Sequence, residues 1–314
     1  MRCLITGGAG FIGSHLSHRL LTQGNQVVIL DALSEEYDPA VKLENLAQVR
    51  AAGAFEFIRA DIRDTAAVSH ALREHHVDAI FHLAAMPGVR RSVVAPLLCN
   101  DINVQGTLSL LEAAKSAGVR KLVFASSSSV YGTGVPIPFE ETQTRACPIS
   151  PYAASKLAGE HLCHAYAHLC GISIVCLRLF TVYGPRQRPD LAISKFIRAI
   201  LDGAGIPLFG DGWSRRDYTY CADAVNAFVA AMDLESPFEV INVASGHPVF
   251  LRDVVSCIAG ATNREPIICR MPPQAGDLDT TEANIDKARS LLDYAPSVPF
   301  SEGIRRQVEW TRNR

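Results

Sequence analysis

Three glycines near the amino terminus limit most strongly how this chain can fold. Gly7, Gly10 and Gly13 have the spacing G-x-x-G-x-x-G, between an apolar run, Cys3–Thr6, and a helical pattern, Ile12–Leu21. Glycine lets a backbone turn tightly and lets a phosphate group approach the amides at the start of a helix. The pattern therefore predicts a strand–turn–helix unit that binds a dinucleotide. The backbone contacts are expected from Gly7, Gly10, Phe11, Ile12 and Gly13.

Strand-like and helical segments alternate through the first half of the chain. The further apolar runs are Val27–Leu30, Phe55–Ile58, Ala79–Leu83 and Leu122–Ala125. Helical periodicity fills the segments between them, as in Thr65–Glu74 and Ile102–Ala117. Nearly continuous apolar strands separated by helices are typical of a parallel sheet covered on both faces, and right-handed crossovers make such a sheet doubly wound. We therefore predict a Rossmann fold of the α/β class.

The character of the sequence changes after Tyr183. A helix at Pro151–Leu169 and a strand at Ile172–Leu179 complete the regular half, whereas the remainder is richer in proline, glycine and charge. The run Val240–Gly246 is typical of a strand that returns to the sheet, and Ser301–Arg312 of a closing helix. We predict a nucleotide-binding domain at 1–177 with a return of about 217–247. A smaller C-terminal α/β domain for the substrate is expected at 178–216 and 248–314.

Composition excludes several classes of protein. The 314 residues are 48% hydrophobic with a formal net charge of −2, so we expect neither a disordered chain nor a nucleic-acid-binding protein. No run approaches the roughly 20 apolar residues of a membrane span, and the amino terminus begins as a strand rather than a signal peptide. The nine cysteines form no C-x-x-C pair. That usage indicates reduced thiols and a cytoplasmic protein.

A carboxylate at the end of the second strand indicates which dinucleotide is bound. Asp31 lies 18 residues after Gly13. There it can accept a hydrogen bond from a ribose 2′-hydroxyl and would repel a 2′-phosphate, so NAD is expected rather than NADP. Ligands of such folds lie outside the carboxyl ends of the strands. The residues in that position after the third and fourth strands are Asp61, Ile62, Leu83, Ala84 and Ala85.

One cluster of side chains invites a metal-binding interpretation. His161, Cys163, His164 and His168 share a helical segment, and His164 and His168 have the i,i+4 spacing of a metal pair. No H-E-x-x-H pattern and no distant third ligand accompany them. We therefore interpret the cluster as a solvated helix face and expect no metal site.

A tyrosine and a lysine one helical turn apart predict the chemistry. Tyr152 and Lys156 form Y-x-x-x-K on one face of their helix. A free tyrosine has a pKa of about 10, too high for a base at neutral pH, but a nearby ammonium and a positive nicotinamide ring both favour the phenolate. The run Ser126–Ser129 directly follows the fifth strand. Its hydroxyls are placed to hydrogen-bond a sugar oxygen and share its proton.

These motifs, in this order, resemble the extended short-chain dehydrogenase/reductase superfamily, within its nucleotide-sugar epimerase branch. The resemblance spans nearly the whole chain and rests on TGGAGFIG, Asp31, HLAA, SSSSVYG, YAASK, LRLFTVYGP, RRDYTY and AGD. It implies a catalytic set of Ser127, Tyr152 and Lys156, of which the last two also contact the cofactor. It further implies Asn103 near the cofactor ribose. The substrate contacts that it implies are Phe209 against a uracil ring, Arg216 on the diphosphate and Asp277 of the AGD motif.

The resemblance also implies the reaction. A UDP-sugar is epimerised at C4 without an external reductant, and NAD is expected to be tightly held and not exchanged. Tyr152 takes the proton of the sugar 4-hydroxyl while the C4 hydrogen passes to NAD as hydride. A transient 4-keto sugar then presents its other face and receives the same hydride back. Relatives pair into dimers through the helices corresponding to Ile102–Ala117 and Pro151–Leu169, so a homodimer is expected.

Differences between this sequence and related branches of the superfamily indicate which substrate to expect. The 4,6-dehydratases place an Asp-Glu pair near Ser127 and Ser128, and this stretch is all serine here, so dehydration lacks its acid and base. UDP-glucose 4-epimerases usually have Asn at the position of Thr181. They also usually have Arg three residues before the position of Asp277, where this chain has Gln274. The segments FTVYGP, RQRPD and Q-x-G-D instead resemble UDP-glucuronate 4-epimerases, which form UDP-galacturonate.

Chemistry gives a reason for a dedicated glucuronate site. The 4-keto form of glucuronate is a β-keto acid inclined to lose CO₂. A non-decarboxylating enzyme should therefore keep the C5–carboxyl bond out of alignment with the carbonyl π system. Ser128, Ser129 and Thr181 are expected to supply neutral hydrogen bonds to the carboxylate, and Arg188 a charge.

Three other functions remain as alternatives. The first is interconversion of UDP-glucose and UDP-galactose by the same machinery. The second is decarboxylation of UDP-glucuronate, whose enzymes usually carry other residues around the serine run. The third is a non-catalytic dinucleotide-sensing regulator, which commonly lacks the pair formed here by Tyr152 and Lys156.

Overall fold

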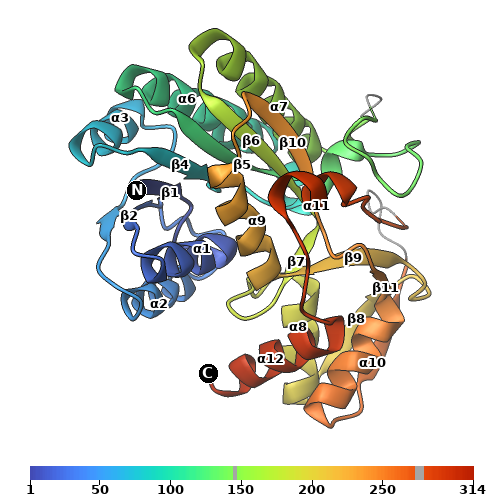
Figure 1. Ribbon diagram of the computed structural model, residues 1–314. Coiled ribbons are helices and arrows are strands. Elements are labelled where there is room, and N and C mark those ends of the chain that lie inside the picture. Colours follow the sequence, from blue (N-terminus) through green and yellow to red (C-terminus); the bar gives the residue numbers. More distant parts are fainter. Residues whose placement is uncertain (144–146, 273–278) are drawn as a thin grey trace.

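A seven-stranded parallel sheet forms the centre of the molecule (Figure 1). The computed structural model describes residues 1–143, 147–272 and 279–314. The strand order is β10-β6-β5-β4-β1-β2-β3, and each neighbouring pair runs parallel. The strands are β1 (Arg2–Thr6), β2 (Gln26–Leu30), β3 (Glu56–Ile58), β4 (Ala79–His82), β5 (Lys121–Ser127), β6 (Ser173–Leu179) and β10 (Phe238–Val243). This order confirms the predicted doubly wound sheet.

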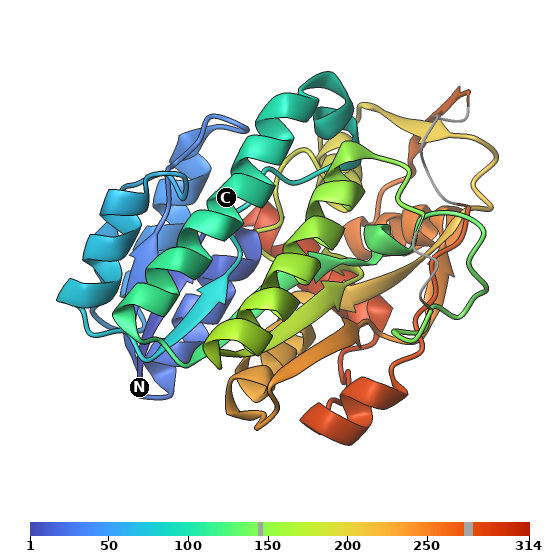
Figure 2. The same cartoon turned by 90° about the horizontal axis from the view of Figure 1, so that it is seen from above.

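Helices cover both faces of this sheet (Figures 1 and 2). One face carries α3 (Thr65–Glu74), α6 (Gly106–Ala117) and α7 (Pro151–Cys170). The other carries α1 (Phe11–Thr22), α2 (Pro39–Arg50) and α9 (Cys221–Asp233). A cluster of buried apolar side chains lies under each layer, one including Leu72 and Leu110 and the other Leu16 and Phe228. Burial on both faces explains why the strands are apolar along their whole length.

The helix that carries the Y-x-x-x-K motif begins at a capped turn. The Ser150 hydroxyl accepts a hydrogen bond from the amide of Ala153 at 3.2 Å, and Pro151 occupies the first turn of α7. Both residues are typical of a helix start, because the hydroxyl pairs a free amide and proline has none. The helix ends at Gly171, whose φ of +66° is the left-handed conformation that favours glycine. Tyr152 is thereby held in the first turn of α7.

The chain before α6 differs from the continuous helix predicted at Ile102–Ala117. Two short helices, α4 (Val89–Val94) and α5 (Pro96–Asn100), lead into a π-helical turn at Asp101–Gln105, and α6 follows directly. A wider turn displaces side chains from the regular helical positions. Here it allows the buried Asn103 to reach across to α7, where its amide nitrogen donates to Ser155 Oγ at 2.9 Å.

The remaining elements form a smaller lobe with two further sheets. A three-stranded sheet contains β7 (Thr181–Tyr183), β9 (Arg215–Tyr220) and β11 (Pro248–Phe250), and a parallel pair contains β8 (Gly205–Phe209) and β12 (Ile267–Met271). The helices of this part are α8 (Ala192–Asp202), α10 (Leu251–Thr262) and α12 (Phe300–Arg312), whereas α11 (Asp286–Leu292) packs against α9 and β10 of the large sheet. Figure 1 shows α8, α10 and α12 on the side of the molecule away from α6 and α7. The predicted smaller α/β part is therefore present.

The returning strand lies earlier than Val240–Gly246, the range expected from the sequence. β10 ends at Val243, and the chain then turns at Gly246, whose φ is +74°. The buried carboxylate of Asp217 causes this turn, because it accepts from the amide of Ser245 at 2.8 Å and from that of Gly246 at 3.1 Å. Amides bound to a carboxylate are no longer available to pair with a neighbouring strand.

After β9 the chain passes from the smaller sheets back to the large one. β9 belongs to the three-stranded sheet, whereas α9 and β10, which follow it, belong to the seven-stranded sheet and its covering layer. The domain limits at 177, 217 and 247 stay a prediction. In the part of the chain that the structure describes, no helix combines the length and the apolar character needed to cross a membrane.

Candidate active site

The glycine turn packs directly against the end of the fourth strand. Gly7 has a φ of +71°, and a Cβ atom on it would lie 2.8 Å from the backbone nitrogen of Ala84. A Cβ on Gly13 would lie 2.3 Å from the carbonyl oxygen of Gly7. Neither position has room for a side chain. Two of the predicted cofactor segments, the glycine turn and Leu83–Ala85, are thus brought together.

The turn leaves the start of α1 suited to a phosphate group. Gly10 caps the helix with no side-chain hydrogen bond, and the first intrahelical bond runs from the amide of Ser14 to the carbonyl of Gly10. The amides of Phe11, Ile12 and Gly13 therefore have no partner within the helix. Together with the positive end of the helix dipole they form an anion-binding position, which fits the pyrophosphate of a dinucleotide.

Asp31 lies beside this turn and is itself held in place. Its buried carboxylate accepts from the amide of Ala9 at 3.1 Å and from that of Leu33 at 2.8 Å. Lys42 of α2 approaches the same carboxylate at 3.3 Å. A carboxylate has about four acceptor sites, so Asp31 keeps capacity for a ribose hydroxyl. The donor set and the close-packed glycines together fit NAD.

The predicted residues at the end of the third strand have different surroundings. Asp61 pairs with Arg63 at 2.8 Å, and this hydrogen-bonded guanidinium lowers the pKa of the Asp61 carboxyl. Ile62 is buried, and its side chain lies 2.5 Å from the position that a Cβ on Gly106 would occupy. Ile62 therefore packs against the start of α6, and its backbone rather than its side chain is the part placed for a ligand.

The Y-x-x-x-K motif and the serine run meet at the ends of β5 and α7. Tyr152, which is partly buried, shares a hydrogen bond with the Ser127 hydroxyl. Lys156 is buried, and its ammonium donates to the carbonyl of Ala125 on β5 at 2.8 Å. The three residues expected to be catalytic therefore lie together at the carboxyl end of β5. Their catalytic roles stay a prediction.

Burial and charge act on these groups in opposite directions. Burial raises the pKa of the Tyr152 phenol, while the hydrogen bond with Ser127 and the positive charge of Arg188 lower it. Burial also lowers the pKa of Lys156 to about 8. The Lys156 ammonium binds the backbone of β5, one helical turn from Tyr152. Its expected action on the phenol stays a prediction.

The remaining serines and Thr181 lie beside Ser127. The Ser127 hydroxyl donates to Ser129 Oγ at 3.1 Å and accepts from the Ser129 amide at 3.2 Å, in the short helical turn Ser128–Tyr131. Thr181 is exposed at the start of β7, two residues after Leu179, which pairs with Ser127 across the sheet. These hydroxyls therefore gather at the ends of two neighbouring strands.

Arg188 reaches the site from the segment that follows β7. Its guanidinium makes a two-point contact with Asp190, at 3.0 and 2.7 Å. It also lies over the ring of Tyr37, 6.0 Å from the ring centroid. Tyr37 and its neighbour Glu36 belong to the segment between β2 and α2, and no sequence motif marks them. Their place near Arg188 depends on the contact between two distant parts of the chain.

Asn103 is buried between the segment that follows β4 and helix α7. Its side-chain oxygen accepts from the amide of Met86 at 2.7 Å, and its nitrogen donates to the carbonyl of Met86 at 3.2 Å and to Ser155 Oγ at 2.9 Å. The amide is therefore fully used within the protein. Asn103 fastens the segment after β4 to α7. Its place near the cofactor ribose stays a prediction.

The predicted contacts for the nucleotide lie on the smaller lobe. Phe209 ends β8, and the guanidinium of Arg90 lies over its ring, 5.4 Å from the centroid. Arg216 lies on β9, and one of its nitrogens donates to the carbonyl of Arg215 at 3.0 Å. Asp277 lies outside the described residues. The uracil and diphosphate contacts of Phe209 and Arg216 stay predictions.

A buried ion pair that no motif marks lies behind the site. Glu160 of α7 pairs with Arg178 of β6 through two contacts, at 2.9 and 2.8 Å. Glu160 also accepts a hydrogen bond from Ser126 Oγ at 2.5 Å. Because Glu160 lies one turn after Lys156, the pair ties α7 to both strands that end at the site. The sequence signal for this ion pair was Glu160, a charged residue in the interior of a helix.

The histidine cluster on α7 faces outward. His161, His164 and His168 are exposed, whereas Cys163 is buried against the sheet. Within 1–143, 147–272 and 279–314, no group of three or more His, Cys, Asp or Glu side chains is arranged to hold a metal ion.

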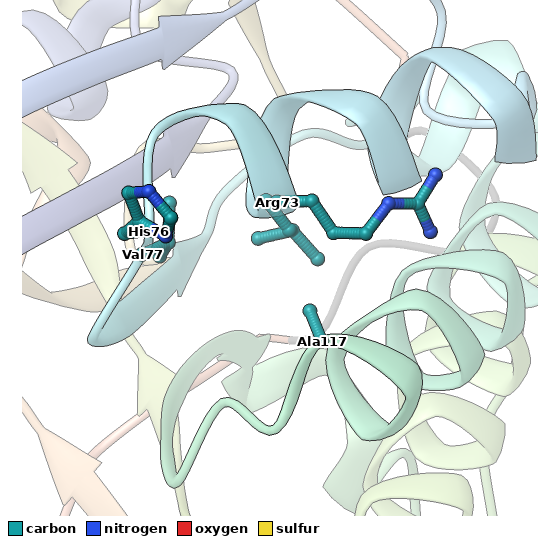
Figure 3. A pocket seen from close by; sticks show the side chains of 5 residues that line it. Arg73, His76, Val77 and Ala117 are labelled. Carbon is teal, nitrogen blue, oxygen red and sulfur yellow. The ribbon is translucent and has the colours of Figure 1, made fainter.

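A surface pocket lies at the end of the seven-stranded sheet opposite to the glycine turn and Tyr152. Leu72, Arg73, His76, Val77 and Ala117 line it, between α3 and α6 (Figure 3). Figure 3 shows the Arg73 guanidinium extending along α3 rather than into the pocket. His76 and Val77 precede β4, so this pocket lies at the amino ends of the strands, away from the predicted ligand site.

The chain is similar to known proteins over nearly its whole length. The model of the NAD dependent epimerase/dehydratase family matches residues 3–244. A UDP-glucuronate 4-epimerase of Thermodesulfobacterium geofontis is 37% identical, over 98% of this chain and 95% of the relative. A UDP-glucose 4-epimerase of Mycolicibacterium smegmatis is 41% identical, over 100% of this chain and 99% of the relative.

A solved structure is similar along the full length. It is the crystal structure of a UDP-glucuronic acid 4-epimerase from Bacillus cereus in complex with UDP-glucuronic acid and NAD. Its TM-score to this chain is 0.92 at 36% sequence identity, and the match covers 100% of this chain and 99% of that chain.

Proposed function

Because the chain belongs to the NAD dependent epimerase/dehydratase family, we propose that it is an NAD-dependent 4-epimerase that interconverts UDP-glucuronate and UDP-galacturonate. The similarity to UDP-glucuronate 4-epimerases over nearly the whole chain supports this substrate. The observation in the molecule that carries the proposal is the contact of α7 with the end of β5. The buried Lys156 ammonium donates to the carbonyl of Ala125 at 2.8 Å, which brings the Y-x-x-x-K motif to the strand end that presents the serine run.

NAD is the cofactor, and the residues around the glycine turn fit it. The free amides at Phe11, Ile12 and Gly13 would hold the pyrophosphate, and the carboxylate of Asp31 a ribose hydroxyl. When bound, NAD accepts the hydrogen of the substrate C4 as hydride and returns it.

The protein residues move the proton and orient the sugar. The Tyr152 phenol takes the proton from the 4-hydroxyl and gives it back, with the Ser127 hydroxyl sharing that hydrogen-bond network. Lys156, with its pKa lowered to about 8 by burial, holds a positive charge beside the strand end below that pH. A positive charge in this place favours the ionised form of the phenol.

The hydroxyl groups and Arg188 hold the substrate carboxylate. Ser128, Ser129 and Thr181 donate neutral hydrogen bonds, while the Arg188 guanidinium supplies the balancing charge. Fixing the carboxylate keeps the C5–carboxyl bond away from alignment with the C4 carbonyl. The 4-keto acid then retains its CO₂ until C4 is reduced again.

The same machinery suits a second substrate, UDP-glucose. The 41% identity to a UDP-glucose 4-epimerase favours this candidate. Since Arg188 already pairs with Asp190, a neutral sugar leaves no unpaired charge in the site. The presence or absence of a substrate carboxylate is therefore what distinguishes the two candidates.

One experiment tests the proposal and separates its alternatives. The purified protein, without added cofactor, is incubated with UDP-glucuronate, UDP-glucose, UDP-N-acetylglucosamine and UDP-xylose, and the products are resolved by NMR. We expect UDP-galacturonate from UDP-glucuronate. A product from UDP-glucose alone would establish the second candidate, and a UDP-pentose as the main product would indicate a decarboxylase. No product from any of the four would refute the epimerase proposal.

We also infer a homodimer in the cytoplasm. Val94 and Leu97, each 86% exposed, lie on α4 and α5, which pack against α7. An apolar surface of this kind next to α6 and α7 supports pairing of two chains through these helices. All nine cysteines are free thiols, two of them exposed, which supports a reducing compartment.

A further inference from the structure

The segment that carries Arg188 has a backbone conformation that its own sequence does not favour. Arg186 has a φ of +64°, in the left-handed region that a residue with a side chain rarely adopts. Such a conformation persists only where the surroundings impose it. Contacts with the surroundings must therefore hold the segment from Gly184 to Leu191, here called the arginine segment.

Two buried glutamines hold its inner side. Gln187, 3% exposed, lies within the arginine segment, and Gln307, 1% exposed, lies on α12 near the carboxyl terminus. The side-chain nitrogen of Gln307 donates to the side-chain oxygen of Gln187 at 2.9 Å. The side-chain oxygen of Gln307 accepts from the amide of Gly184 at 2.9 Å. The side-chain amide of Gln307 thus uses both its donor nitrogen and its acceptor oxygen to contact the arginine segment.

The backbone partners fix the orientation of the Gln187 amide. Its oxygen accepts from the amide of Ser194 at 3.2 Å, and its nitrogen donates to the carbonyl of Val182 at 3.0 Å. Turning the amide over would place two donors together and two acceptors together. Because both glutamines are buried, a lost hydrogen bond there leaves a polar group without a partner.

The outer side of the arginine segment is held by the helices around the glycine turn. The His15 ring nitrogen Nε2 donates to the carbonyl of Pro185 at 2.8 Å, and Arg186 donates to Gln48 Oε1 at 2.7 Å. A further nitrogen of Arg186, Nη1, is buried with no hydrogen-bond partner among the described residues. The segment is therefore fixed between α1 and α2 on one side and α12 on the other.

Arg188 follows Gln187 directly and inherits its position. A shift of the Gln187 backbone would move Arg188 away from Tyr37 and from the Tyr152 phenol, on which its charge acts. The contact with Asp190 cannot prevent this, since Asp190 lies two residues along the same segment. Only partners outside the segment can set where the guanidinium points.

We propose that Gln307, through Gln187, is a positioning residue that aims Arg188 at the substrate carboxylate, so that the C-terminal helix helps to set the preference for a uronate. The inference rests on the proposed function. It assigns no contact with the substrate to Gln307.

A misplaced Arg188 should have a chemical signature. With the carboxylate loosely held, the C5–carboxyl bond of the 4-keto sugar can align with the carbonyl. The bond then breaks, CO₂ leaves, its electron pair passes into the C4 enolate, and C5 takes up a proton. The product is a UDP-4-ketopentose, and return of the hydride first taken from C4 reduces it to a UDP-pentose. A general loss of rate would not by itself change the proportion of this product to UDP-galacturonate.

The test compares Gln307→Leu with the wild type in three measurements on the whole enzyme. These are the KM for UDP-glucuronate, the inhibition constant of UDP, and the ratio of UDP-pentose to UDP-galacturonate by NMR. We expect the KM to rise about tenfold, the effect of one lost charge-assisted contact. The inhibition constant of UDP should stay within about twofold. The pentose ratio should rise several-fold.

Ile304→Ala is the matched control. Ile304 is fully buried on the same helix, one turn earlier, and belongs to the apolar core rather than to the glutamine network. The control should lower the melting temperature without changing the pentose ratio. If Gln307→Leu does not fold, Gln307→Asn, which keeps the amide but shortens its reach, replaces it with the same expected direction.

The outcomes are distinct. An unchanged KM and pentose ratio in a folded Gln307 variant would overturn the inference. So would an equal change in Ile304→Ala, because that would indicate general loosening of α12. A wild type that does not epimerise UDP-glucuronate would instead overturn the proposed function itself.

Discussion

The base of the proposed mechanism is a single phenol, which has to ionise to take up a proton. Burial raises the pKa of Tyr152, so the surroundings have to favour the phenolate by other means. The structure supplies a hydrogen bond with Ser127 and the charge of Arg188, both of which lower that pKa. If the proposed function holds, the charge that binds the substrate carboxylate also acts on the base, which would link substrate binding to proton transfer.

Removing the phenolic hydroxyl tests this assignment. We expect Tyr152→Phe to reduce kcat at least about 100-fold, the range usual for loss of a general acid–base group. The affinity for UDP should be unchanged, because no nucleotide contact is removed. Steady-state kinetics with UDP-glucuronate and inhibition by UDP measure the two quantities.

Tyr166→Phe is the matched control for this change. Tyr166 lies on the same helix, α7, and its hydroxyl contacts Glu112 of α6, away from the strand ends. Its loss should leave kcat within about twofold of the wild type. If Tyr152→Phe retained full activity, the phenol would not be the base.

At the scale of single residues, local motifs predicted the candidate site only where spacing carries the information. The glycine turn, Tyr152 and Lys156 have fixed spacings, and the structure brings them to one end of the sheet. Asn103 is different, because its amide binds the backbone of Met86. The partners of Arg188 include Tyr37, more than a hundred residues away in the chain. No local pattern can predict either contact.

Strands and helices around the site are joined by a hydrogen-bonded chain through one buried histidine. The amide of Ala84 donates to Thr6 Oγ1 at 3.2 Å, and that hydroxyl is 2.8 Å from His82 Nδ1. His82 Nε2 lies 3.0 Å from Thr107 Oγ1, which donates to the carbonyl of Asn103 at 2.6 Å. Thr107 gives its one proton to Asn103, so His82 donates at Nε2. In the neutral ring Nδ1 then accepts from the Thr6 hydroxyl. The chain joins β1, β4 and α6 and requires a neutral ring.

This requirement makes folding sensitive to acid. Burial lowers the pKa of His82 from 6.5 to about 3, so the folded protein binds fewer protons than the unfolded chain between these values. The stabilisation is present above pH 6.5 and is lost as the pH falls. We expect this histidine to lower the free energy of unfolding by about 2 kcal/mol between pH 7 and pH 5. Urea denaturation at both pH values measures it.

Two variants isolate the contribution of this ring. His82→Asn, which cannot ionise, should be less stable at pH 7 but should lose about 2 kcal/mol less on acidification than the wild type. The exposed His168→Asn should follow the wild type at both pH values. An unchanged acid sensitivity in His82→Asn would show that another group is responsible.

At the scale of elements, prediction succeeded where the hydrophobic pattern was regular. The sheet strands begin and end within a few residues of their expected positions, because they are buried on both faces. α2 has no regular apolar pattern, since Lys42 and Asn45 are among its buried residues. The π-helical turn before α6 also escapes prediction. A polar contact between helices, from Asn103 to Ser155, accompanies it.

For the whole molecule, the candidate site depends on segments from both lobes. The seven-stranded sheet presents the glycine turn and Tyr152, whereas Thr181, Phe209 and Arg216 lie on strands of the smaller sheets. The order of strand and helix along the chain predicted the large sheet. It could not predict how the smaller sheets pair, because β7 joins β9, whose partner β11 comes from later in the chain.

Assembly of the molecule gives a prediction at this scale. We expect light scattering to give the mass of two chains for the wild type and of one chain for Leu97→Glu. The charge would be placed in the exposed apolar surface formed by α4 and α5. Leu43→Glu, at a 53% exposed leucine on α2, should remain a dimer. A wild-type monomer, or a dimer that survives Leu97→Glu, would exclude this surface as the interface.

In the proposed reaction, one hydrogen leaves C4 of the sugar and returns to the same carbon from the other side. UDP-glucuronate carrying deuterium at C4 tests it directly, in ordinary water and without added cofactor. We expect UDP-galacturonate that retains the deuterium at C4, with none released to the solvent, as measured by NMR and mass spectrometry. Product in which the C4 deuterium has been replaced by a solvent proton would contradict it.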